Sequence, residues 1–181
     1  MVNSQIEEKA TQILRKCRVS TAPVNILKVA QMLGAKVGFQ PFREELSGML
    51  VRKDDQIIIG VNSRHPKTRQ RFTIAHELGH WQLGHQGELF LDKTLRSRSV
   101  SIKKRDQRAA EGTDKEEIDA NAFAAAILMP ESLLIAAVEK RLRGDDGYAI
   151  DRLVGDLAGE FEVSSQAMEH RLTNLGMMIP S

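Results

Sequence analysis

The chain has 181 residues, 41% of them hydrophobic, and a formal net charge of +2, which fits one domain or one domain with a small appendage. A single cysteine, Cys17, excludes an intrachain disulfide framework and suits a reducing compartment, where we expect it to be inert packing. No hydrophobic run reaches the length of a membrane span and the N-terminus has no signal-peptide pattern, so we expect a cytoplasmic protein that does not enter a membrane.

The first third of the chain predicts two helices followed by three short strands. Apolar residues recur at helical spacing between residues 4 and 17 and again between 25 and 33, where Gly34 is placed to end the second helix. The strands are expected at 36–41, 47–52 and 56–61, with a turn at 53–55 that makes a hairpin of the last two.

Residues 76–80 read His-Glu-Leu-Gly-His, an HExxH sequence inside a run of helical periodicity. Two histidines four apart lie on one face of a helix, so His76 and His80 can reach a single Zn²⁺. Glu77 can then take a proton from a water molecule at the metal, which makes it the candidate general base.

The competing interpretation of this pentapeptide is a surface helix with two exposed histidines and an exposed glutamate. Pro66 is well placed as a first-turn proline of the helix. An apolar stripe predicts that the helix packs in a core, which argues against the surface interpretation. The stripe consists of Phe72, Ala75, Leu78 and Gly79.

A catalytic zinc needs a third protein ligand, and five downstream residues carry suitable side chains. A three-histidine site of metzincin spacing would need a histidine at position 86, where the chain has Gln86. We therefore expect His85 to be a helix-end residue or part of a substrate cleft. The candidates are His85, Glu111, Glu116, Glu117 and Asp119.

The better ligand candidate lies in a helix expected from Thr113 to about Met129, ended by Pro130 and followed by another over 131–143. Thr113 and Glu116 read as a capping box at its start. Glu117 and Asn121 share a face, from which Asp119 is rotated away, and an asparagine one turn on suits a ligand's need for orienting hydrogen bonds. Alanines at 120, 122 and 124–126 would let this helix approach Gly79 closely. The alternative is that Glu117 and Asp119 are solvated first-turn carboxylates.

Two further segments carry unusual charge. Residues 93–108 hold seven basic residues against one acid, a net of +6, and are expected to form an exposed, mobile loop that is either simply solvated or guides an acidic substrate or nucleic acid. Residues 150–161 and 165–175, with Ser164 as a cap, resemble a helix-turn-helix. Over 151–176 the net charge is −3, so we expect this module to pack on the catalytic part or bind a protein rather than DNA.

Three stretches together resemble the ImmA/IrrE family of zinc metallopeptidases: IGVN at 59–62, RFTIAHELGH at 71–80 and EIDANAFAAAILMP at 117–130. The resemblance implies a cytoplasmic endopeptidase that cleaves a helix-turn-helix repressor and so derepresses genes. It maps His76, His80 and Glu117 onto the zinc ligands and Glu77 onto the general base. Asp119, where many relatives carry Glu, and the long segment 91–113 depart from the family pattern.

The expected fold is α+β: a mostly helical zincin-like domain with a small three-stranded sheet over residues 1–130, and a helical, helix-turn-helix-like module over 131–181. Zn²⁺ is the expected cofactor, with Mn²⁺ and Fe²⁺ as alternatives. Asn121 is the expected outer partner of a ligand, and no oxyanion donor is assigned among Tyr148, His85 and His170. The rival function is a DNA-binding or protein-binding regulator with a structural or relic metal site.

Overall fold

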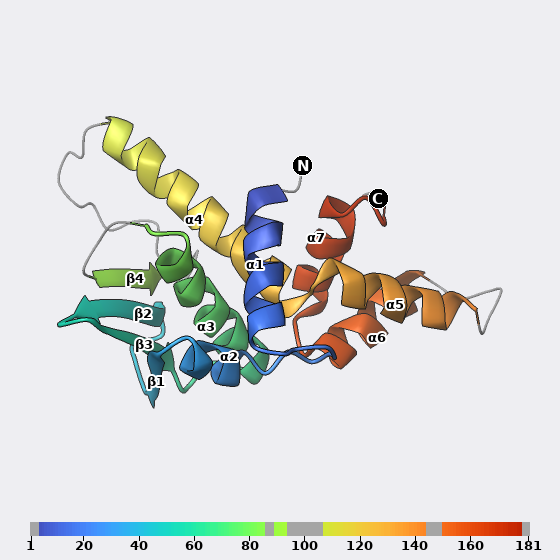
Figure 1. Cartoon of the computed structure of the whole chain (residues 1–181), viewed down its shortest axis with the longest axis horizontal. Helices are drawn as coiled ribbons and strands as arrows, with labels where there is room; N and C mark the ends of the chain where they lie inside the picture. The colour runs from blue at the N-terminus through green and yellow to red at the C-terminus, as the bar shows by residue number, and fades with distance from the viewer. Residues whose placement is uncertain (1–3, 86–88, 94–106, 144–149, 179–181) are drawn as a thin grey trace. The chain divides into compact units, whose positions relative to one another are not determined.

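A computed structural model describes residues 4–85, 89–93, 107–143 and 150–178, and the fold is α+β as predicted (Figure 1). The chain forms two compact units, one of residues 26–124 and one that joins residues 1–25 to 125–181. This division differs from the predicted boundary at residue 130, because the N-terminal helix groups with the C-terminal helices.

The first unit is built on a mixed sheet with the strand order β1-β3-β2-β4. β1 pairs with β3 in parallel, and β2 pairs with both β3 and β4 in antiparallel fashion. Helix α3 packs on β2 and β3, as Figure 1 shows, and α2 packs on β1 and α3. The elements are α2 (Ile26–Met32), β1 (Ala35–Gln40), β2 (Leu46–Lys53), β3 (Gln56–Asn62), α3 (Lys67–Gln82), β4 (Leu89–Lys93) and α4 (Gln107–Leu128). Only the part of α4 up to residue 124 belongs to this unit.

The three predicted strands and their hairpin are present, with small shifts at their ends. Asp54 and Asp55 form the β2–β3 turn with φ of 50° and 59°, a left-handed conformation that Asp tolerates better than most residues and that fits the twist of a tight hairpin. Gly34 follows α2 with φ of 101°, as its predicted role at a helix end requires.

β4 and the start of α4 differ from the sequence-based expectations. β4 adds a fourth strand beside β2, so Lys93 lies in the sheet and not in a loop. Helix α4 begins at Gln107, which places Thr113 inside the helix and makes the predicted capping box wrong. The good helix formers between 108 and 111 carry the helix past that point. The central part of the predicted basic loop, residues 94–106, lies outside the described residues.

The second unit contains the helices α1 (Ser4–Lys16), α5 (Glu131–Leu142), α6 (Ile150–Phe161) and α7 (Ser165–Asn174). Ser164 caps α7 as predicted, since its Oγ accepts a hydrogen bond from Ala167 N at 3.1 Å. Arg171 of α7 is buried, donating from Nε to the Met129 carbonyl at 3.0 Å and from both Nη atoms to the Glu7 carboxylate. Among the described helices no single one is long and apolar enough to cross a membrane.

Candidate metal centre

The middle of α3 is buried on every side, from Thr73 to His80. The exposed fractions of His76, Glu77 and His80 are 4%, 0% and 1%, so the surface-helix interpretation of the HExxH sequence is wrong. Phe72, itself half-buried, stacks on the His76 ring with 6.5 Å between centroids. Pro66 precedes the helix at the N-cap position rather than in its first turn.

A close approach of α3 to α4 brings the two helices' polar residues together. A Cβ on Gly79 would lie 3.1 Å from the Ala120 carbonyl oxygen and 3.2 Å from the Phe123 ring, closer than nearly all real Cβ contacts. Small residues on both helices, Gly79 and Ala120, therefore permit the spacing that the sequence pattern predicts. Glu117 lies one turn before this contact and faces α3.

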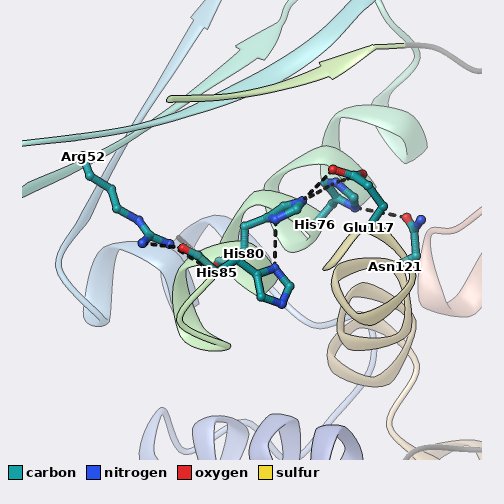
Figure 2. Close-up of polar contacts among 6 residues, drawn as sticks. All are labelled: Arg52, His76, His80, His85, Glu117 and Asn121. Atoms are coloured by element: carbon teal, nitrogen blue, oxygen red, sulfur yellow. Dashed lines mark hydrogen bonds and ion pairs between the residues drawn. The ribbon is translucent and has the colours of Figure 1, made fainter. Parts of the chain in front are cut away.

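Three side-chain atoms of His76, His80 and Glu117 converge on one point (Figure 2). The two histidine Nε2 atoms are 3.0 Å apart, and Glu117 places one carboxylate oxygen 3.3 Å from His76 Nε2 and the other 3.4 Å from His80 Nε2. Ligand atoms at zinc-bond lengths around one tetrahedral ion are about 3.3 Å apart. The residues present therefore fit a single metal ion with bond lengths like those of zinc.

The outer ring nitrogens of both histidines also have partners. His76 Nδ1 lies 3.0 Å from the Asn121 Oδ1, and His80 Nδ1 lies 2.9 Å from His85 Nδ1. An amide oxygen accepts a hydrogen from Nδ1 of His76 and leaves its Nε2 to offer a lone pair toward the centre. The structure thus brings Asn121 to the position expected of an orienting residue.

Burial and neighbouring charges set the protonation states. Burial lowers the pKa of His80 to about 3, with the His76 imidazole adding to the effect and Glu117 opposing it. Burial would raise the pKa of Glu117, but its contact with the His76 ring and the nearby imidazoles outweigh that effect, so the pKa is lowered. A neutral imidazole and an ionised carboxylate near neutral pH are the forms that bind a divalent metal.

Glu77 points to the sheet side of α3, where β2 comes very close. A Cβ on Gly48 of β2 would lie 2.2 Å from the Thr73 Cγ2, 2.9 Å from the Gly60 carbonyl oxygen and 3.5 Å from Glu77 Oε1. Only glycine allows this approach of strand and helix. Gly48 is not among the residues that the sequence singles out, and its one sequence signal is a glycine inside a predicted strand.

The other sequence candidates lie elsewhere. Glu116 and Asp119 are half-buried on α4 and do not join the converging atoms. His170 is exposed on α7, and both Tyr148 and the side chain of Glu111 lie outside the described residues. His85 is a buried helix-end residue, one of the two roles expected for it. Arg52 of β2, which no sequence pattern singled out, donates to the carbonyl oxygens of His80 and His85 at 2.9 and 2.7 Å.

Comparison with known proteins shows the family of the chain. The model of the IrrE N-terminal-like domain matches residues 30–173. The chain belongs to this family. It is 34% identical over 119 residues to the radiation response metalloprotease IrrE of Deinococcus radiodurans, covering 64% of this chain and 30% of that protein.

A solved structure has the same fold. A Mycobacterium tuberculosis transcriptional regulator superposes with a TM-score of 0.66 over 95% of this chain, at 16% sequence identity. The chain spans 47% of that protein and 30% of IrrE, so it matches only part of each of them.

Proposed function

We propose that this protein is a zinc-dependent endopeptidase. The observation that carries the proposal is the convergence of the His76, His80 and Glu117 donor atoms on one point, with Glu77 following the first of them in the HExxH sequence. The chain belongs to the IrrE N-terminal-like domain family, and the similar protein IrrE is a metalloprotease. Both findings support metal-dependent peptide hydrolysis.

In this proposal His76, His80 and Glu117 hold the ion, and Asn121 orients His76. A zinc ion bound there would polarise the scissile carbonyl and make a nearby water molecule acidic. Glu77 takes a proton from that water as its oxygen attacks the carbonyl carbon, and then passes the proton to the amine nitrogen as the C–N bond breaks. Zn²⁺ suits a set of two histidines and one carboxylate, with Mn²⁺ and Fe²⁺ as alternatives.

The proposed substrate is a cytoplasmic regulatory protein, namely a helix-turn-helix repressor whose cleavage derepresses genes. The resemblance of three motifs to the ImmA/IrrE family supports it, and the buried free thiol of Cys17 suits a reducing compartment. Within the described sheet, β4 is an edge strand that pairs with β2, and α3 packs on the same sheet. Zinc peptidases bind extended substrates along such an edge by strand addition.

The test is incubation of the purified protein with a helix-turn-helix repressor encoded beside its gene, with fragments identified by mass spectrometry. Cleavage should need zinc and stop with a chelator. Glu77→Gln should lower the rate by at least about 100-fold while the protein still folds and binds zinc. Glu116→Gln, a change of the same kind on α4 outside the converging atoms, is the control and should cleave normally. A Glu77→Gln protein that cuts at the wild-type rate would refute the mechanism.

A DNA-binding regulator is the rival, and one observation weighs against it. Of the two arginines in the helix-turn-helix-like segment, Arg171 is buried against Glu7 and so does not offer its charge to a phosphate. Specific gel-shift binding with a steep salt dependence, by a protein that cleaves nothing, would favour the rival.

A further inference from the structure

The end of α3 folds back so that His85 lies over the last turn of its own helix. Gly84 has φ of 75°, its N–H donates to the Trp81 carbonyl at 3.2 Å, and the N–H of His85 donates to the His80 carbonyl at 3.1 Å. These two bonds with a left-handed glycine make a Schellman motif, which returns the chain toward the third residue before the cap. The backbone therefore places His85 next to His80.

The two imidazoles meet nitrogen to nitrogen. His80 and His85 bring their Nδ1 atoms to 2.9 Å, with the rings nearly perpendicular at 74°. When Nε2 of His80 gives its lone pair to a metal, its Nδ1 carries the hydrogen and donates to Nδ1 of His85. His85 then carries its own hydrogen on Nε2. This arrangement gives the metal-binding tautomer of His80 an acceptor for its Nδ1 hydrogen.

Arg52 holds this turn from the neighbouring strand. Its guanidinium donates from Nη1 to the His85 carbonyl and from Nη2 to the His80 carbonyl, so one planar group bridges the two residues that the motif brings together (Figure 2). A fork of this shape fixes direction as well as distance. The carbonyls that it binds belong to the C-terminal end of α3, where a cation is also favoured by the helix dipole.

We propose that His85 is a positioning residue for the metal ligand His80, and that Arg52 holds His85 in place. The inference rests on the proposed zinc centre and adds to it a second orienting contact, the counterpart of Asn121 on His76. Partners of this kind set ring orientation and ligand basicity, and their loss commonly lowers metal affinity about 10–100-fold.

Two substitutions separate the hydrogen bond from simple packing. His85→Phe keeps a ring against His80 but has no acceptor, whereas His85→Asn places an acceptor near the position of Nδ1 and removes the ring. We expect His85→Phe to bind zinc about 10–100-fold more weakly than wild type, and His85→Asn to recover most of the affinity. His170→Phe, the same change at an exposed histidine, is the control and should bind like wild type.

Zinc affinity is measured by competition with a chromophoric chelator, and the hydrogen bond by ¹H–¹⁵N NMR of the zinc-loaded protein. In zinc-loaded wild type the hydrogen on His80 Nδ1 should resonate downfield as a hydrogen-bonded proton, and in His85→Phe it should move upfield because the acceptor is gone. Affinity that survives in His85→Phe and falls in His85→Asn would overturn the proposal in favour of packing. If His85→Phe does not fold, the zinc affinity of His85→Ala is compared with that of His85→Asn. Weaker binding by His85→Ala supports the proposal, and equal binding overturns it. Wild type that takes up no zinc at all would instead refute the metal centre itself.

Discussion

Each unit of the molecule has a buried polar centre, and the two are built on opposite principles. In the unit of residues 1–25 and 125–181, every described contact of Arg171 joins a donor to an acceptor: the Met129 carbonyl and the Glu7 carboxylate. In the unit of residues 26–124, the converging atoms of His76, His80 and Glu117 are all capable of acceptance, and two ring nitrogens face each other at 3.0 Å.

The difference separates a centre that is complete without a ligand from one that is not. Buried polar groups are stable when opposite kinds meet, as around Arg171. Lone pairs that converge on one point need a proton or a cation between them. We therefore expect the contribution of the Arg171 centre to stability to be the same with and without metal. The contribution of the histidine centre should depend on metal.

The largest expected effect concerns the Arg171 centre. Arg171→Met should lower the free energy of unfolding by about 3–5 kcal/mol, because it leaves the Glu7 carboxylate without its buried partner. Zinc affinity of the folded protein should not change. Urea titration measures the first quantity and chelator competition the second. Arg152→Met, at an exposed arginine of α6, is the control and should cost well under 1 kcal/mol. An Arg171→Met protein as stable as this control would contradict the comparison.

Zinc addition tests the other centre. Free zinc at about 100 times its dissociation constant should raise the free energy of unfolding by about 2.7 kcal/mol. Glu117→Gln should lose most of this gain at the same zinc concentration, because a neutral amide replaces the charged donor, whereas Glu116→Gln should keep it. Thermal unfolding with and without zinc gives the measurement. An equal gain in both variants would mean that the metal binds elsewhere.

The close approach of α3 to α4 predicts a smaller effect. Gly79→Ala should cost about 1–3 kcal/mol, because its Cβ must push Ala120 and Phe123 away. It should also weaken zinc binding, because a shift of α4 away from α3 moves Glu117 away from the two histidines. Gly155→Ala on α6 meets nothing within 4 Å and should instead stabilise the protein by about 0.5–1 kcal/mol. If both substitutions stabilise, the contact is not as tight as described.

The smallest expected effect concerns Cys17, which lies in the unit without the proposed metal centre. Burial raises the pKa of its thiol, an effect that Lys16 opposes only in part. A raised pKa means less thiolate at a given pH, so at pH 8 the native protein should react with a thiol reagent more slowly than free cysteine. Urea should abolish the difference. A native rate that equals the rate in urea would show that this part of the core is open.

Local patterns in the sequence predicted much of the helical structure. The ends of α6, the Ser164 cap and the glycine after α2 depend on residues within a few positions of one another, and the structure has all of them. Prediction failed where distant parts of the chain decide the outcome. β4 exists through its pairing with β2, and α1 groups with helices more than a hundred residues away.

The proposed metal centre divides in the same way. Helical periodicity is a short-range property, and it was enough to predict that His76, Glu77 and His80 share a helix and that Glu117 and Asn121 share a face of another. The packing of distant segments was needed for the two faces to meet at Gly79, for His85 to turn back onto His80, and for Arg52 to bind both carbonyls. Arg52 is 28 and 33 residues from those acceptors, and a contact over that separation depends on how strand and helix pack.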